Sequence, residues 1–391
     1  MESFFRTHAY LIEHTDMPVR RALLDEVDWH QPLIGIKGTR GVGKTSFLLQ
    51  YAREHFGAQS HRCLYVNMNN FYFQGKGLAE FAHDFRAQGG EVLLIDQVFK
   101  HPEWSHELRR CHDQNPGLRI IFTGSSVMRL KEENPELNGL VTSYNLRGFS
   151  FREFLNLKTG LNLPAYSLQE IRQHHIAIAA EILKQVNPLE FFASYLHHGF
   201  YPFFLEKRNF SENLLKTMNM MIEVDILLIK QVELKYLPKL KKLLYLMAVE
   251  RPSSPNVSQL AQDIEVSRAT VMNYIKYLSD ARLINILYHE GEEFPKKPAR
   301  IMMHNSNLMY AIYPNKMQEI DVMETFFQNA LWAYHDVRIG DRLSTFKVDG
   351  RMYSVCTGAP RRRHDEVVYA RSDIQQGEAN TIPLWLFGFL Y

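Results

Sequence analysis

One stretch near the start of the chain combines glycines, a lysine and a hydroxyl residue at a spacing that suits phosphate chemistry. The pattern G-x-x-x-x-G-K-[ST], known as Walker A, is matched by Gly38-Thr39-Arg40-Gly41-Val42-Gly43-Lys44-Thr45. Its glycines let backbone amides converge on phosphate oxygens at the start of a helix. The lysine reaches the β- and γ-phosphates as a point charge, and the hydroxyl ligates Mg²⁺. The sequence therefore predicts a loop that binds ATP and Mg²⁺.

The predicted nucleotide contacts are this loop and the residue after it. They are Gly38, Thr39, Arg40, Gly41, Val42, Gly43, Lys44, Thr45 and Ser46. Lys44 is also a predicted catalytic residue, and Thr45 a predicted metal ligand. A glycine loop without a ligand is the alternative. The apolar run 31–36 before the loop and the helix formers 45–51 after it favour the nucleotide site, because a phosphate loop needs a strand before it and a helix after it.

A second motif supplies a carboxylate. Residues 92–96 are four apolar residues followed by an acid, the form of a buried Walker B strand that delivers Asp96 beside Mg²⁺. An acid at the end of an apolar strand is common, so this prediction depends on the loop upstream. Asp96 is predicted to be both a metal ligand and a catalytic residue, and Gln97, which follows it, a catalytic residue that can orient water.

A third apolar run, 118–123, ends in hydroxyl residues. Thr123 and Ser125 are predicted to contact the γ-phosphate or the attacking water. The sequence leaves open the alternative that these hydroxyls bond their own backbone in a turn at the strand end.

The elements that must position these residues follow from the spacing of apolar residues. Strand-like runs at 31–36, 63–68, 91–96 and 118–123 alternate with segments of helical spacing such as 104–112. This alternation predicts an α/β fold, a P-loop NTPase parallel sheet with helices on both faces. Beyond it, apolar residues three and four apart predict a largely helical region up to residue 249.

Two short helices joined by a tight turn are predicted between residues 256 and 280. The first covers 256–264, and Ser267 caps the second. The outer surface of the second helix carries the predicted contacts with DNA or another partner, which are Arg268, Thr270, Asn273 and Lys276. The alternative is a unit that packs within the chain or contacts protein, and it is favoured because the exposed set is only modestly basic.

These stretches together resemble a known group, prokaryotic AAA-type P-loop ATPases with a C-terminal winged helix and a degenerate restriction-nuclease-like tail, many of them from Bacteroides-type bacteria. The likeness is carried by residues 36–45, 102–105, 122–126, 148–154, 199–203 and 382–391. The resemblance implies four parts: an AAA-type P-loop ATP-binding domain (1–160), a helical lid region (161–249), a winged-helix domain (250–298) and a small α+β nuclease-like tail (299–391).

The chain departs from that group at three places. Relatives commonly have Asp-Glu where this chain has Asp96-Gln97, so the carboxylate expected to polarise the attacking water is absent. Relatives usually have a pair of arginines where residues 138–140 read Asn-Gly-Leu, which removes a candidate arginine finger. In the tail, Asp341 alone cannot hold a catalytic metal. We therefore expect impaired ATP hydrolysis and an inactive tail.

Composition and charge limit the partners, metal sites and location that we expect for the protein. A formal net charge of +2 over 391 residues gives no molecule-wide attraction for nucleic acid, although a local basic face remains possible. The three cysteines are far apart and are expected to be reduced thiols, and the 17 histidines show no metal-ligand spacing. No charged leader precedes an apolar stretch and no run approaches the ~20 apolar residues that cross a bilayer, so we expect a cytoplasmic protein without a membrane partner.

The sequence therefore predicts a Mg-ATP-binding AAA-type ATPase, or ATP-dependent switch, that couples nucleotide state to DNA or protein binding, with a homo-oligomer as one possible assembly. The alternative is a non-enzymatic interaction module that ATP stabilises and that acts through its winged helix or tail.

Overall fold

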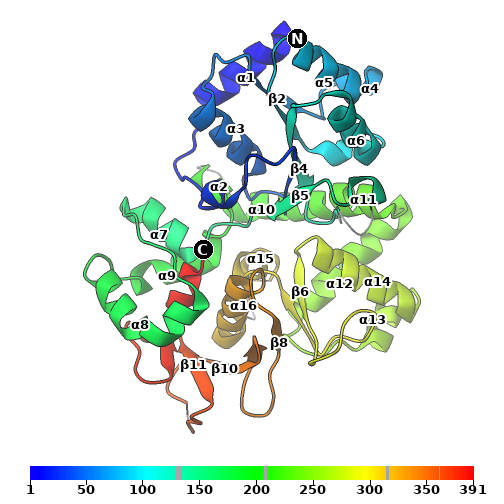
Figure 1. Ribbon diagram of the computed structural model, residues 1–391. Helices are drawn as coiled ribbons and strands as arrows, with labels where there is room; N and C mark the ends of the chain where they lie inside the picture. The colour runs from blue at the N-terminus through cyan, green and yellow to red at the C-terminus, as the bar shows by residue number, and fades with distance from the viewer. Residues whose placement is uncertain (129, 131–133, 207–208, 314–316, 361) are drawn as a thin grey trace. The chain divides into compact units, whose positions relative to one another are not determined.

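A computed structural model describes residues 1–391 apart from 129, 131–133, 207–208, 314–316 and 361 (Figure 1). The chain divides into two compact units, residues 1–148 and 149–391. The finer division into four parts with boundaries at 160, 249 and 298 stays a prediction.

The first unit contains a five-stranded parallel sheet in the order β2-β3-β4-β1-β5. Its strands are β1 (Leu33–Gly38), β2 (Cys63–Asn67), β3 (Val92–Asp96), β4 (Arg119–Ser125) and β5 (Thr142–Asn145). Every residue of β3 is buried, and β1 and β4 are buried almost throughout. Continuous apolar runs of this kind suit strands that are covered on both faces.

Helices cover the two faces of this sheet. Figure 1 shows α1 and α3 on one side and α5 and α6 on the other. The bounds are α1 (Glu2–His14), α2 (Leu23–Glu26), α3 (Lys44–His55), α4 (Tyr72–Gly75), α5 (Leu78–Ala87) and α6 (Trp104–Gln114), with 3₁₀ turns at Val98–Lys100 and Pro135–Leu137. The predicted α/β sheet with helices on both faces is therefore present. The four predicted strands correspond to β1–β4, while β5, which is short and polar, was not predicted.

The second unit opens with helices, as the spacing of apolar residues predicts. They are α7 (Phe151–Thr159), α8 (Leu168–Leu183), α9 (Leu189–His198), α10 (Phe210–Met220), α11 (Leu227–Lys230) and α12 (Leu237–Val249), with 3₁₀ turns at Pro202–Leu205 and Leu234–Tyr236 and a π-helical turn at Met221–Ile226. Ser150 and Ser167 begin α7 and α8 through capping boxes with Glu153 and Glu170, which satisfy backbone amides at the two helix starts.

The two short predicted helices are α13 (Val257–Asp263) and α14 (Arg268–Asp280). Their first turns are capped by Asn256, which accepts from the Gln259 amide, and by Ser267, which accepts from the Thr270 amide. An antiparallel pair, β6 (Ile284–Leu287) and β7 (Arg300–Met303), follows α14.

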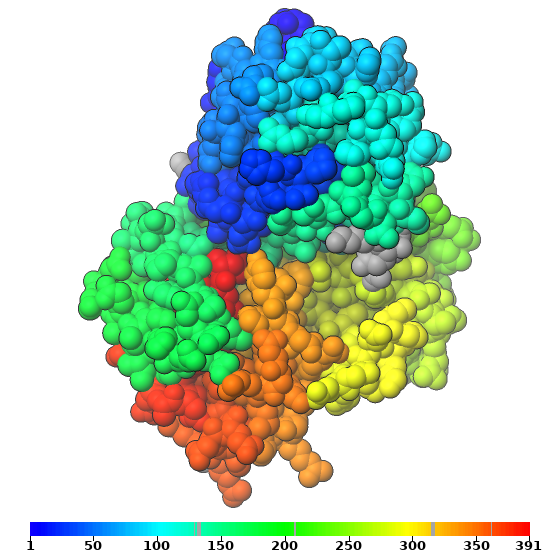
Figure 2. Space-filling view, in the orientation of Figure 1, coloured from blue at the N-terminus to red at the C-terminus, as the bar shows by residue number. Residues whose placement is uncertain are grey.

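The C-terminal part of the chain combines helices with a second five-stranded sheet. A mixed sheet has the order β12-β11-β10-β9-β8. Its elements are α15 (Ser306–Ile312), α16 (Glu319–Leu331), β8 (Val337–Ile339), β9 (Phe346–Val348), β10 (Arg351–Cys356), β11 (Val367–Arg371), β12 (Thr381–Pro383) and a 3₁₀ helix at Leu384–Phe389. This last segment is completely buried, and Figure 2 shows the end of the chain (red) between the green α7–α9 region and the orange α15–α16 region.

Candidate phosphate-binding site

The loop between β1 and α3 has a backbone that requires glycine at two positions. Gly41 and Gly43 have φ angles of 86° and 92°, in the left-handed region where a Cβ atom is strained. Gly43 immediately precedes Lys44, the first residue of α3. The amides at the start of this helix have no partner within the helix, so they are suited to an anion.

Gly38 is required for a different reason. A Cβ atom at this position would lie 2.4 Å from the carbonyl oxygen of Leu146. The chain leaving β5 therefore passes directly against the start of the loop, and only a residue without a side chain allows this approach.

Two hydrogen bonds hold the side chain of Lys44 against the loop. Lys44 Nζ donates to the carbonyl oxygens of Gly38 (2.7 Å) and Thr39 (2.8 Å). These bonds fix the ammonium group against the loop, and its contact with the β- and γ-phosphates stays a prediction.

The predicted metal residues meet at the carboxyl ends of β3 and β4. Thr45 Oγ1 donates to Oδ2 of Asp96 at 2.7 Å, and Thr123 Oγ1 donates to Oδ1 of the same carboxylate at 2.5 Å. Asp96 and Thr123 are buried. Because the Thr45 proton is directed to Asp96, the lone pairs of its oxygen can face a cation.

Two residues of this cluster escaped the sequence analysis. Tyr65 Oη and Asn67 Nδ2 donate to Oδ2 of Asp96 at 2.8 and 3.1 Å. They lie two residues apart on β2, so they share a face of the strand, and Asn67 is paired with Asp96 in the sheet register. The sequence signal that could have identified both residues is their polar groups at the carboxyl end of an apolar strand, β2, which lies beside β3. Burial and the Asp96 charge raise the pKa of Tyr65, so its hydroxyl remains a donor.

Gln97 has an unusual backbone. Its φ and ψ are 57° and 47°, in the left-handed region that non-glycine residues seldom occupy. Its amide donates to Thr123 Oγ1 at 2.8 Å. Thr123 is therefore hydrogen-bonded both to Asp96 and to Gln97, the position expected for a general base. Its hydroxyl does more than close a turn of its own backbone.

Ser125 and the remaining loop residues have separate environments. Ser125 is buried, and its Oγ accepts from the Val127 amide at 3.4 Å, a bond of the turn type that the sequence left open. Thr39 and Val42 are buried, whereas Arg40 and Ser46 are half-buried in the loop and in the first turn of α3.

The predicted partner contacts on α14 differ in their exposure. Arg268 and Asn273 are exposed. The Thr270 hydroxyl lies 2.8 Å from Ser267 Oγ, and Lys276 Nζ donates to Asp280 at 2.5 Å. The Lys276 side chain is only 26% exposed. The face that α14 presents is therefore less basic than its sequence suggests.

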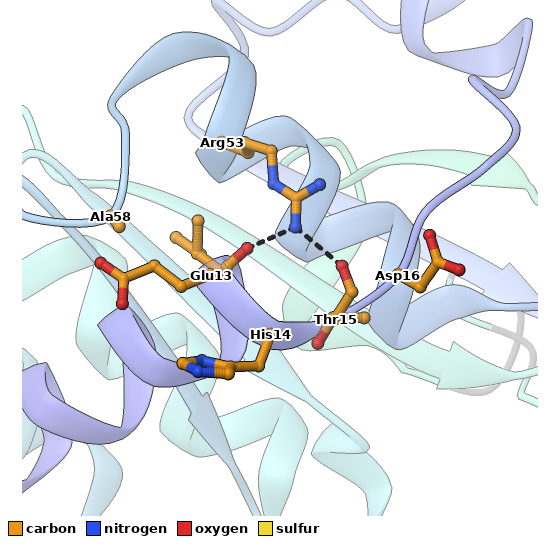
Figure 3. A pocket seen from close by; sticks show the side chains of 7 residues that line it. Glu13, His14, Thr15, Asp16, Arg53 and Ala58 are labelled. Carbon is orange, nitrogen blue, oxygen red and sulfur yellow. Dashed lines mark hydrogen bonds between the residues drawn. The ribbon is translucent and has the colours of Figure 1, made fainter.

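A surface pocket of about 560 Å³ lies elsewhere in the first unit (Figure 3). Arg53 donates to the carbonyl oxygens of Ile12 and Thr15 and so caps the C-terminal end of α1. Arg53 is nine residues after Lys44 on the same helix, which places it about 13 Å along α3 from the phosphate loop at ~1.5 Å per residue. The pocket is not part of the phosphate-binding site.

Within the residues that the structure describes, no three His, Cys, Asp or Glu side chains gather in a way that could hold a metal ion. An Mg²⁺ ion bound with a nucleotide does not require such a cluster, because phosphate oxygens and waters complete its coordination. The described helices include none with the length and apolar character needed to span a membrane.

Two protein families match parts of the chain. Residues 30–155 match the family described as AAA domain, and residues 189–304 match a domain of unknown function (DUF8612). The first match covers the phosphate loop, the Asp96 cluster and all five strands of the parallel sheet.

Two similar proteins come from one archaeon. The chain is 26% identical over 323 residues to uncharacterized protein MJ1637 of Methanocaldococcus jannaschii, which covers 79% of this chain and 64% of that protein. It is 26% identical over 268 residues to MJ1544 of the same organism, covering 64% and 55%. The chain thus spans less than two thirds of the length of either relative.

Among solved structures, C. elegans PCH-2 is similar at 13% identity over 71% of this chain and 67% of that one, with a TM-score of 0.25, which is too low to support a functional argument. The family match and the assembled loop agree with each other: residues 30–155 form an AAA domain of the P-loop ATPase type.

Proposed function

We propose that this chain is an ATP-dependent switch that binds Mg-ATP at the loop Gly38–Thr45 and hydrolyses it slowly. The observation that carries the proposal is the hydrogen bond of 2.7 Å between Thr45 Oγ1 and Asp96 Oδ2, which brings the last residue of the loop to the acid that ends β3. These two motifs are 51 residues apart in the sequence and meet where a phosphate-bound Mg²⁺ would be held.

The side chains present fit such a cation. Thr45 and Asp96 offer hard oxygen atoms, and Mg²⁺ in phosphate sites is usually held by one or two protein oxygens with phosphate and water. Bound there, Mg²⁺ would neutralise charge on the β- and γ-phosphates. Lys44 adds a fixed positive charge at the loop, while Tyr65 and Asn67 keep the Asp96 carboxylate oriented.

Slow hydrolysis follows from Gln97. A glutamine amide can hydrogen-bond a water molecule but cannot accept its proton as a carboxylate can. Gln97 also occupies a backbone position fixed by Thr123, so the side chain starts from a defined place next to Asp96. Glutamine does orient water in some GTPases, so its presence slows proton removal without preventing hydrolysis.

Single-turnover ATP hydrolysis tests this proposal. General-base assistance is worth ~10²–10⁴ in rate, so Gln97→Glu should raise the rate well above that of the wild type. The absence of the arginine pair near residues 138–140 would keep even this variant below a fully equipped ATPase. The double variant with Lys44→Ala should lose the gain. Brisk wild-type turnover that Gln97→Glu leaves unchanged would overturn the claim that this position limits hydrolysis.

In this proposal, the second unit couples the nucleotide state to the binding of a partner. The helices α13 and α14 with the β6–β7 pair contain the elements of a winged helix, and the helical region before them is the proposed lid. Arg268 and Asn273 are its exposed polar contacts, and DNA and protein remain alternative partners. Because Lys276 is paired with Asp280, protein is the favoured partner. Duplex binding at low salt that weakens in Arg268→Ala and with added salt would favour DNA instead.

The tail is proposed to be an inactive nuclease-like domain. Two acids of α16 that could have served a metal are paired with arginines: Asp321 with Arg251 at 3.0 Å, and Glu324 with Arg300. Asp341 accepts from the Leu343 amide in its own turn. The alternative function is a non-enzymatic module in which ATP only stabilises the chain and the winged helix or tail makes the contact. Measurable ATP turnover would exclude that alternative.

A further inference from the structure

A buried arginine connects the phosphate loop to the end of the first unit. Arg21, between α1 and α2, is 7% exposed. Its Nη1 donates to the carbonyl oxygen of Val42 in the loop at 3.1 Å. Its Nη2 donates to the carbonyl oxygens of Arg147 (2.7 Å) and Gly148 (3.3 Å). One planar side chain thus holds backbone atoms from two segments about a hundred residues apart.

A second contact joins the same two segments without Arg21. The Leu146 amide donates to the Lys37 carbonyl oxygen at 2.7 Å, and the Leu146 carbonyl lies against Gly38, the first residue of the loop. The segment 146–148 is therefore tied to both the beginning and the middle of the loop. A change in the loop backbone cannot leave this segment unaffected without breaking at least one of these contacts.

The chain enters the second unit one residue later. The Phe149 amide donates to the Phe200 carbonyl oxygen at 2.8 Å, and the Phe149 carbonyl oxygen accepts from Tyr195 Oη at 2.7 Å. Ser150 then caps α7. The last residue bonded to Arg21 and the first residue bonded within the second unit are thus consecutive, Gly148 and Phe149.

We propose that Arg21 is a positioning residue that couples the phosphate loop to the junction, defined here as residues 146–149, so that a nucleotide on the loop restrains the point where the chain enters the second unit. This inference rests on nucleotide binding at the loop. Arginine suits the role because its donors are fixed in one plane, whereas lysine presents a single nitrogen that cannot span the Val42 and Gly148 carbonyls in the same way.

Hydrogen–deuterium exchange on the full chain tests the coupling. Peptides that cover residues 39–45 and 144–152 are followed with Mg²⁺ alone and with Mg²⁺ plus a non-hydrolysable ATP analogue, and analogue binding is measured separately by calorimetry. In the wild type the analogue should slow exchange in both peptides, and coupling free energies of the usual size correspond to about 5-fold or more at the junction.

Arg21→Gln is the test variant and Arg20→Gln its matched control. Arg20 is the neighbouring residue, but its guanidinium is exposed and pairs with Asp25 and Glu54 at the surface. In Arg21→Gln the analogue should still protect the loop but no longer slow exchange at the junction, while Arg20→Gln should behave as the wild type. Arg21→Lys should recover part of the response. A purely structural role would instead raise exchange equally with and without the analogue.

The outcomes separate this inference from the proposed function. If the wild type does not bind the analogue, the proposed function fails. The hydrogen bonds of Arg21 can still be tested without nucleotide, because Arg21→Gln alone should then raise exchange in both peptides. If the analogue binds and protects the loop while the wild-type junction is unchanged, the coupling is wrong whatever the variants do. An Arg21→Gln protein that keeps the full nucleotide response at the junction would also overturn it.

Discussion

The Tyr65 hydroxyl donates a hydrogen bond of 2.8 Å to the Asp96 carboxylate, so a tyrosine of the edge strand β2 supports the acid of the neighbouring strand β3. Tyr65→Phe should lower the free energy of unfolding by about 1.5 kcal/mol, the low end for a bond to a charged group, because other donors remain on Asp96. Partners that orient a metal residue typically contribute ~10-fold or more in metal affinity, so the Mg²⁺ concentration needed for ATP binding should rise by ~10-fold.

Tyr10→Phe is the matched control, because Tyr10 is 61% exposed in the same unit. Urea denaturation and ATP titrations at several Mg²⁺ concentrations measure the two effects. A Tyr65→Phe protein with unaltered Mg²⁺ dependence would show that this hydrogen bond only stabilises the fold.

The buried residue His8 should make the free energy of unfolding depend on pH. It is completely buried on α1, and its Nδ1 accepts from the Tyr65 amide at 3.0 Å. Burial lowers the pKa of His8 from 6.5 to about 4. The unfolded chain therefore takes up a proton at a higher pH than the folded one, and the free energy of unfolding falls as the pH drops from 6.5 to 4. This shift corresponds to about 3 kcal/mol.

His8→Asn checks this assignment, because an asparagine carbonyl can accept the same hydrogen bond and does not titrate. Chemical denaturation at pH values between 4 and 7 should give a shallower loss of stability for the variant. Parallel pH profiles for the two proteins would mean that His8 is not the group responsible.

Gly38 and Gly57 of the first unit are glycines for different reasons, and alanine substitution should distinguish them. Gly38→Ala should destabilise the unit by about 1–3 kcal/mol and abolish ATP binding, because its Cβ would press on the Leu146 carbonyl and displace the loop. Gly57 has a φ of 76° and no neighbour within 4 Å of a built Cβ. Gly57→Ala should therefore cost about 1 kcal/mol from backbone strain and leave ATP binding intact. Full ATP affinity in Gly38→Ala would contradict the close contact.

The sequence predicted most of the first unit because local signals and tertiary structure agree there. The glycine loop and the apolar strand ending at Asp96 each specify a local structure that the fold retains. Thr45, Asp96 and Thr123 could be placed together because the carboxyl ends of parallel strands meet at one edge of a sheet.

The remaining features depend on contacts between segments far apart in the sequence. Tyr65 looked like an ordinary strand residue, and its role appears only when β2 is set beside β3. Arg21 lies in an irregular segment, and its partners are main-chain carbonyls, which leave no mark in a sequence. Lys276 looked available on an exposed helix face until Asp280, one turn later, was seen to pair with it.

The proposed switch depends most directly on Mg-ATP binding to the loop that contains Lys44. A ligand that binds only the native state at about 100 times its Kd adds ~2.7 kcal/mol of stability, which corresponds to a rise in Tm of about 5–10 °C for a unit of this size. Thermal unfolding with and without Mg-ATP should show this rise in the wild type and in Lys76→Ala, a surface lysine paired with Glu80, but little of it in Lys44→Ala. A wild-type Tm that Mg-ATP leaves unchanged, or equal rises in the wild type and Lys44→Ala, would contradict it.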